Sequence, residues 1–214
     1  GSDNSAAGMA VAGYATRTTG TNVGVYGSTN STSGFAFYAA GSGTDYGPFT
    51  GAHEVKLDGV FNQQVKPGLI VSVTGRAEAR HTSDGQVSIS STLPTVRLAD
   101  TPEDRAVLGV LVADETLPRN HWYTPQSGER FASINALGEG RVWVTDLNGD
   151  IQAGDYITTS AVPGYGQCQD DDVLHSYTLG KATETVNWDK VTDTIEVDGH
   201  TYKIYLLAVV YTSG

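Results

Sequence analysis

Residues 138–169 read GEGRVWVTDLNGDIQAGDYITTSAVPGYGQCQ, and this stretch alternates short apolar segments with glycine-containing turns. Residues 141–145 (RVWVT) are typical of a β-strand, in which successive side chains point to opposite faces. Asn148-Gly149 predicts a tight turn, because both residues tolerate positive φ. A second strand is expected within residues 151–160, and Pro163-Gly164 turns the chain again. The stretch therefore predicts a sheet of short strands joined by tight turns.

The same character extends over residues 51–214. Val, Thr, Ile and Tyr are plentiful, there are 26 glycines, and no long apolar period of 3.6 residues is present. Nearly continuous apolar runs at residues 69–75, 106–113 and 202–211 predict buried strands. Short helical turns are expected only at residues 101–104 and 170–174. We predict a mainly β fold, a compact barrel-like or sandwich-like domain with little helix.

Near the N-terminus a tyrosine returns every twelve residues, in VAGY (11–14), VGVY (23–26) and FAFY (35–38). A repeat this short cannot bury its own apolar face, so it must stack on other copies. We therefore expect residues 3–50 to form a β stalk, an intertwined trimer of chains. A disordered Gly/Ser/Thr linker is the alternative. Gly1-Ser2 is interpreted as a cloning scar, with the natural N-terminus missing.

Composition excludes several classes of function. The chain carries 24 acidic and 13 basic residues, a formal charge of −11, and it has no basic cluster. Binding to nucleic acid or to an anionic membrane is therefore not expected. No run approaches eighteen apolar residues, so no transmembrane span is expected. Cys168 is the single cysteine, which excludes an intrachain disulfide and a multi-cysteine zinc site.

These motifs, taken in their order along the chain, resemble those of a known class of viral protein. One part of the chain resembles a β segment common in the C-terminal domains of phage and large-virus fibre proteins. It consists of residues 140–144, 148–151 and 154–157, followed by Ser160 and Pro163-Gly164. The Gly-Val-Tyr-Gly repeats are similar to stalk repeats of the same proteins, and FTGAH at residues 49–53 resembles the junction of stalk and terminal domain.

The resemblance implies the C-terminal region of a tail fibre or tailspike, with an intramolecular chaperone as its terminal domain. Such a domain would drive homotrimerisation and set the register of the stalk. The protein would be made in the host cytoplasm, lie on the virion, and continue N-terminally into the rest of the fibre.

A receptor-binding tip is the first alternative. Trp122 and Tyr123 lie in the polar segment 115–129, where exposed aromatic rings could stack on host surface glycans. Trp143, Tyr165 and Trp188 are further aromatic residues that could build such a platform.

Self-cleavage in a single turnover is the second alternative, and it is implied only by the resemblance. Of the known autocleaving families, one uses a serine with a nearby lysine and the other cuts beside an aspartate. Ser42, Asp45 and Lys56 are the candidates near the stalk junction. No Gly-x-Ser-x-Gly elbow, phosphate loop or dinucleotide motif suggests another enzyme activity.

No cofactor is expected. The five histidines have no two members closer than 25 residues, so no local spacing suits a metal site. His53 lies at the stalk junction, where three copies could meet on a trimer axis and bind an ion.

Overall fold

In the computed structural model the following residues are described: 15–16, 19–20, 23–26, 28, 52–59, 66–81, 84–115 and 123–212. Most of the predicted stalk therefore lies outside the described residues. Those from 52 onward belong to one compact unit, which extends from Gly47 to Gly214.

The predicted mainly β fold is confirmed. The strands are β1 Ala52–Leu57, β2 Ile70–His81, β3 Val87–Leu98, β4 Val107–Glu115, β5 Arg130–Asn135, β6 Gly138–Thr145, β7 Tyr156–Thr159, β8 Gly166–Cys168, β9 Thr178–Ala182, β10 Thr194–Val197 and β11 His200–Tyr211. The 3₁₀ turn η2, Trp188–Lys190, is the one helical element among the described residues, so none of their helices could span a membrane.

The two predicted helical turns are wrong. Residues 101–104 and 170–174 form turns and bends instead. Glu103 has φ of +55°, in the left-handed region, which no right-handed helix accommodates.

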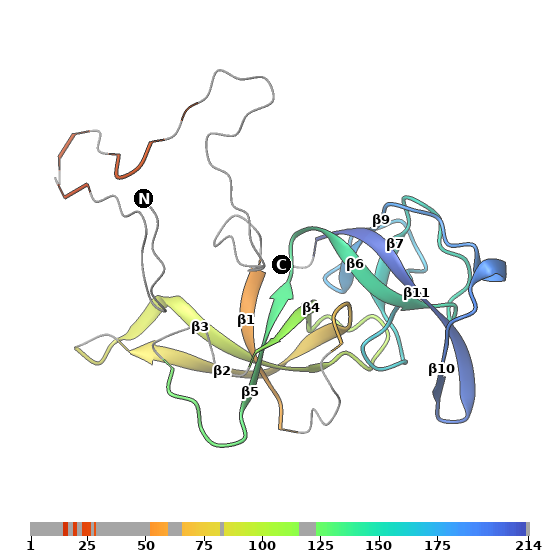
Figure 1. Ribbon diagram of the computed structural model, residues 1–214, viewed down its shortest axis with the longest axis horizontal. Helices are drawn as coiled ribbons and strands as arrows, with labels where there is room; N and C mark the ends of the chain where they lie inside the picture. The colour runs from red at the N-terminus through yellow and green to blue at the C-terminus, as the bar shows by residue number, and fades with distance from the viewer. Residues whose placement is uncertain are drawn as a thin grey trace, which may run out of the picture. The chain divides into compact units, whose positions relative to one another are not determined.

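Strands β1 to β5 form a closed barrel in the order β1-β3-β2-β4-β5 (Figure 1). The first strand, β1, pairs antiparallel with β5 along all of its residues, from Ala52 opposite Asn135 to Leu57 opposite Arg130. Alternate residues of β1 enter the core, where Val55 and Leu57 are buried. The barrel therefore begins with the strand that follows directly on the predicted stalk.

The remaining strands form a second sheet in the order β10-β11-β6-β8-β7-β9 (Figure 1). Strand β11 also pairs with β9 at Val209–Tyr211, so β11, β6, β8, β7 and β9 form a closed circuit, and β10 lies outside it. The stretch 138–169 supplies β6, β7 and β8 of this sheet. Val142 and Val144 of β6 point into its core and are fully buried.

Backbone hydrogen bonds join the barrel to the second sheet. The Gly68 N–H donates to the Leu111 carbonyl at 2.8 Å, and the Gly68 carbonyl accepts from the Trp143 N–H at 2.9 Å. Gly164 makes a similar bridge, accepting from Ile70 at 2.8 Å and donating to Ala99 at 2.7 Å. These bonds satisfy backbone polar groups of the turns at Gly68 and Gly164, and they couple the barrel to the second sheet.

The outer halves of β2 and β3 extend beyond the barrel (Figure 1). The β2–β4 pairs end at Ser72 and the β1–β3 pairs lie at Thr95 and Val96, whereas β2 and β3 pair with each other out to His81 and Val87. We call residues 77–81 with 87–93 the β2–β3 ribbon. A two-stranded ribbon is marginally stable by itself in water, so this one is a natural place for further contacts.

Candidate functional site

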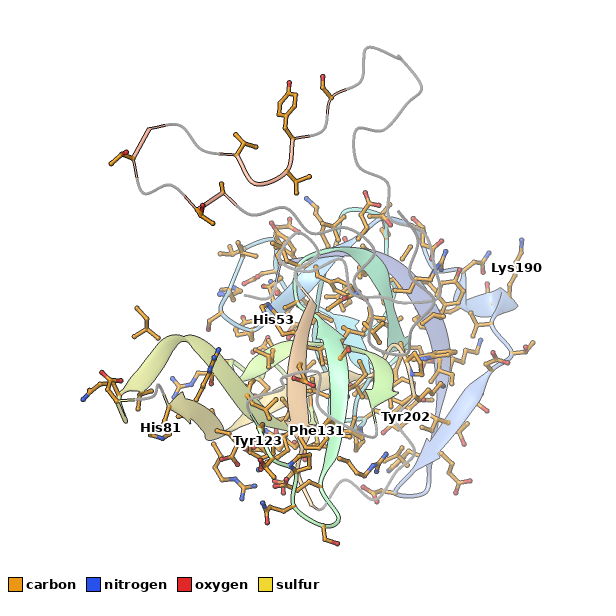
Figure 2. The ribbon with its side chains drawn as sticks, turned by 60° about the vertical axis from the view of Figure 1, so that its left-hand side comes forward. His53, His81, Tyr123, Phe131, Lys190 and Tyr202 are labelled. Atoms are coloured by element: carbon orange, nitrogen blue, oxygen red, sulfur yellow. The ribbon has the colours of Figure 1, made fainter. Side chains whose placement is uncertain are left out.

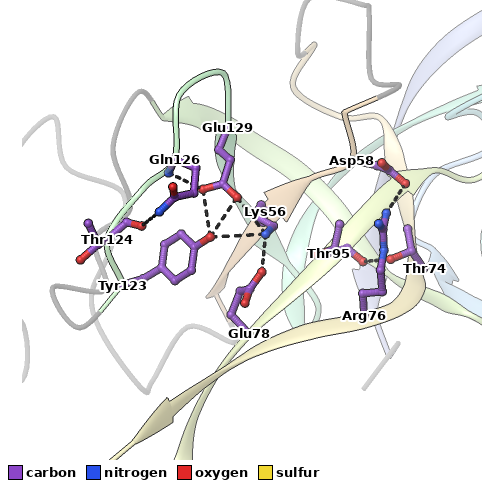
Figure 3. Close-up of polar contacts among 10 residues, drawn as sticks. All are labelled: Lys56, Asp58, Thr74, Arg76, Glu78, Thr95, Tyr123, Thr124, Gln126 and Glu129. Carbon is purple, nitrogen blue, oxygen red and sulfur yellow. Dashed lines mark hydrogen bonds and ion pairs between the residues drawn. The ribbon is translucent and has the colours of Figure 1, made fainter.

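The first candidate site surrounds Lys56, on the outer face of β1 (Figure 3). Its ammonium contacts Glu78 and lies 3.0 Å from Oε1 of Glu129 and 3.4 Å from the hydroxyl of Tyr123. The Lys56 side chain is only 14% exposed. We call these four residues the Lys56 cluster. Lys56 and Tyr123, which the sequence suggested for different functions, thus meet in one site.

Glu129 is the most heavily hydrogen-bonded member of the cluster. The Tyr123 hydroxyl lies 2.9 Å from each of its carboxylate oxygens, and the Gln126 N–H donates to Oε2 at 2.8 Å. Burial disfavours its charge, but the hydrogen bonds from Gln126, Lys56 and Tyr123 outweigh burial and hold the pKa of Glu129 below its ordinary value. The carboxylate therefore stays ionised near neutral pH.

Burial also disfavours the charge of Lys56, yet hydrogen bonds to Glu78, Glu129 and Tyr123 raise the pKa of Lys56 above its ordinary value. A lysine can accept a proton only as the neutral amine. The arrangement therefore favours a structural role for Lys56 and does not favour a general base for self-cleavage. Ser42 and Asp45 lie outside the described residues, as does Trp122, so their parts in the predicted sites stay predictions.

A second ion pair holds the end of β1. Asp58 follows the strand and lies 2.8 Å from Nη2 of Arg76 on β2 (Figure 3). Arg76 is two-thirds exposed, so this pair contributes at most about 1 kcal/mol. Lys56 and Asp58 line a shallow cavity of about 330 Å³ together with Arg76, Glu78 and Glu129. Through Lys56 and Asp58, β1 is tied to β2 and to the segment that leads into β5.

His53 lies near the start of β1, where its side chain is exposed (Figure 2). In the part of the chain that the structure describes, no three His, Cys, Asp or Glu side chains are grouped to hold a metal ion. An ion on a trimer axis needs His53 from three copies and stays a prediction.

The second candidate site is a groove across β6 and β11. The sequence suggested Trp143 as part of an aromatic platform, but it did not predict the groove. Trp143 lines it, half-buried, and the indole N–H donates to the Pro67 carbonyl at 3.0 Å. Lys66 lies 3.5 Å above the ring, and burial lowers the pKa of Lys66 although Asp193 opposes this effect. Tyr165 is buried in the core and offers no exposed platform. The groove depends on pairing Trp143 with Leu206, which are far apart in sequence.

Cys168 gives a testable chemical property. Its half-buried thiol lies 3.7 Å from Oδ2 of Asp155, and burial together with this carboxylate raises the pKa of Cys168 to about 11. Only the thiolate reacts with alkylating reagents. At pH 8 we expect iodoacetamide to label the native protein about 100-fold more slowly than the urea-unfolded protein, measured by intact mass. Equal rates would contradict the raised pKa.

The same pKa difference has a stability consequence. The unfolded thiol loses its proton near pH 9.0, whereas the native thiol keeps it to about pH 11. The contribution of Cys168 to stability is therefore complete below pH 9 and is lost as the pH rises toward 11.

Comparison with known proteins adds no family assignment: no family model matches the chain, and no curated protein is similar to it.

Proposed function

We propose that residues 51–214 form the assembly domain of a trimeric viral fibre, which brings three chains together and sets the register of the stalk. The supporting observation is the way in which β1 is held. It pairs with β5 along its whole length, and ion pairs of Lys56 and Asp58 tie its outer face to β2 and to Glu129. Folding of the domain therefore fixes the chain at the point where the predicted repeats end.

The stalk needs such a nucleus for physical reasons. Repetitive strands that pair between chains specify their register weakly, and contacts between distant segments form slowly. A domain that associates first raises the local concentration of the stalk ends to roughly millimolar. It also aligns them when each stalk begins at the same place on its own domain.

The β2–β3 ribbon offers a surface for this association. Val87 and Ile89 lie two residues apart on β3 and share a face, because alternate residues of a strand point to the same side. Leu93 lies beyond a register shift in the β2–β3 pairing. Leu93 is buried, whereas Ile89 is fully exposed and Val87 is 58% exposed. Exposed apolar side chains on a strand pair with little covering structure are typical of contacts with another chain. We assign the ribbon to the contact between copies.

Light scattering after size exclusion tests this proposal. We expect the mass of three chains for the full chain, and a shift toward the mass of one chain for Ile89→Lys, whose circular dichroism spectrum should show that the domain is still folded. Leu174→Lys is the matched control, because Leu174 is exposed but lies outside the ribbon, and it should leave the mass unchanged. A wild-type monomer would overturn the proposal, and an unaffected Ile89→Lys trimer would remove the ribbon from the interface.

Intact mass spectrometry of the same peak separates assembly from self-cleavage. Full-length chains after long incubation would contradict a single-turnover protease. A fragment whose mass corresponds to cutting near Ser42 or Asp45 would support it, and Ser42→Ala or Asp45→Ala should then abolish the cut.

A further inference from the structure

The groove across β6 and β11 has the size and composition of a ligand site. We call it the Trp143 groove and define it by Arg141, Trp143, residues 190–193 and residues 204–206. Its volume is about 470 Å³, within the range of roughly 300–1,000 Å³ that is common for small-molecule sites. Trp143, Ile204 and Leu206 supply apolar surface, while Arg141, Thr192 and Asp193 supply polar groups.

One wall of the groove, the segment from Trp188 to Asp193, is held in place. The Ile204 N–H donates to the Asp193 carbonyl at 2.9 Å. The Trp188 indole donates to the Gly149 carbonyl at 3.2 Å, and the Lys203 ammonium donates to the Trp188 carbonyl. A wall fixed at both ends needs little ordering when a ligand binds, which lowers the entropic cost of binding.

Two contacts hold the Arg141 side chain in place, and they use only part of its hydrogen-bonding capacity. Its Nη1 donates to the Leu206 carbonyl at 2.9 Å and lies 3.2 Å from Oε1 of Glu184. Within the described residues its Nε and Nη2 make no hydrogen bond, and the side chain is 54% exposed. The Nε and Nη2 edge of a guanidinium matches a carboxylate in a bidentate pair. Arg141 can therefore bind a carboxylate while keeping its present contacts.

A second depression of about 210 Å³ adjoins the Trp143 groove. The two share Arg141 and Leu206, and the second is also lined by Pro67, Gly68 and Tyr211. Arg141 thus lies at the junction of two depressions. An elongated ligand with a carboxylate near its middle fits this arrangement better than a compact one.

We propose that the Trp143 groove binds a saccharide that carries a carboxylate. Arg141 pairs with the carboxylate, and Thr192 and Asp193 hydrogen-bond hydroxyl groups. Lys66 covers one face of the Trp143 ring, so the apolar face of a sugar ring contacts the remaining surface of Trp143 together with Ile204 and Leu206. A strongly acidic peptide fits less well, because Asp193 and the net charge of −11 repel every one of its carboxylates, whereas the saccharide carries few and Arg141 neutralises one of them. The proposed assembly function is not needed for this activity.

Titration followed by NMR of the indole N–H groups tests the proposal on the full chain. The probes are xylotriose bearing one methylglucuronate and the hyaluronan tetrasaccharide, with xylotetraose as the neutral control and hexaglutamate as the peptide control. We expect an acidic saccharide to shift the Trp143 signal with a Kd of about 1 mM. Xylotetraose should bind at least about tenfold more weakly, which corresponds to the loss of one charge-assisted pair.

Three variants locate the site. Arg141→Gln should weaken binding at least about tenfold. Glu184→Gln removes the Arg141 ion pair but keeps the arginine, and it should preserve binding. Arg105→Gln removes an exposed arginine elsewhere and should change nothing. Equal melting temperatures ensure that folding is not responsible.

Several results would overturn the proposal: no Trp143 shift with either acidic saccharide at 10 mM, equal binding of xylotetraose, equal binding of hexaglutamate, or unchanged binding by Arg141→Gln. Equal hexaglutamate binding would assign the groove to acidic peptides instead. Each result can be obtained whether the protein is a monomer or a trimer, so failure here is distinguishable from failure of the assembly proposal.

Discussion

Lys56→Ala is expected to lower the free energy of unfolding by about 2 kcal/mol, because it leaves Glu78 and Glu129 without their shared cation. Glu129 is 20% exposed and Glu78 39% exposed, so solvent screens part of the effect and the full cost of a buried pair is not reached. The loss should also release β1 from its partners. If β1 transmits register to the stalk, the temperature at which the trimer dissociates should fall by more than the loss of domain stability alone explains.

Urea denaturation at pH 7 measures the first effect, and light scattering against temperature measures the second. Arg105→Ala is the control, since Arg105 is exposed and lies outside the ribbon, and it should change stability by less than about 0.5 kcal/mol. A Lys56→Ala variant as stable as Arg105→Ala would show that the Lys56 cluster contributes nothing to holding β1.

The pH dependence gives an independent check on this cluster. The pKa of Glu129 is lowered in the folded protein, so its contribution is present above its unfolded pKa of 4.5 and is lost as the pH falls below that value. Removing Lys56 takes away one of the groups that lower the pKa. The acid limb of the stability curve should therefore be shallower in Lys56→Ala than in the wild type.

The fold class could be predicted because its signals are local. Alternation in residues 141–145 and the turn at Asn148-Gly149 depend only on neighbours, and β6 and Gly149 with φ of +83° appear where they were expected. The closed circuit of the second sheet could not be predicted. It forms because β11 pairs with β6 and β9 from much earlier in the chain, and no local pattern specifies such partners.

The candidate sites were predictable only as separate residues. Lys56 and Tyr123 were selected for different reasons, and their contact spans 67 residues of sequence. A register shift in the β2–β3 pairing between Val73 and Ala77 comes just before Glu78, the residue that meets Lys56. Patterns in one sequence do not determine such irregularities. Neither the Lys56 cluster nor the Trp143 groove could therefore be predicted from the sequence alone.

Gly68→Ala is expected to have the largest effect of the substitutions considered, a loss of about 2–4 kcal/mol of unfolding free energy. Gly68 has φ of +94°, where a Cβ is strained, and a Cβ built there would lie 2.7 Å from Cδ1 of Trp143. The strain costs about 1 kcal/mol and the overpacking about 1–3 kcal/mol more. Trp143 cannot easily move away, because its backbone N–H and its indole N–H are bonded to the Gly68 and Pro67 carbonyls.

Gly85→Ala separates the cost of backbone strain from the cost of overpacking. Gly85 has φ of +82° but nothing within 4 Å of a built Cβ, so it should show the backbone strain alone, about 1 kcal/mol. Urea denaturation of both variants, with the Trp143 indole signal followed by NMR, gives the difference. A large difference with a displaced Trp143 signal would mean that the turn at Gly68 couples the barrel to the Trp143 groove. Equal costs would mean that Trp143 yields freely, and a groove built on such a residue would lose its preformed character.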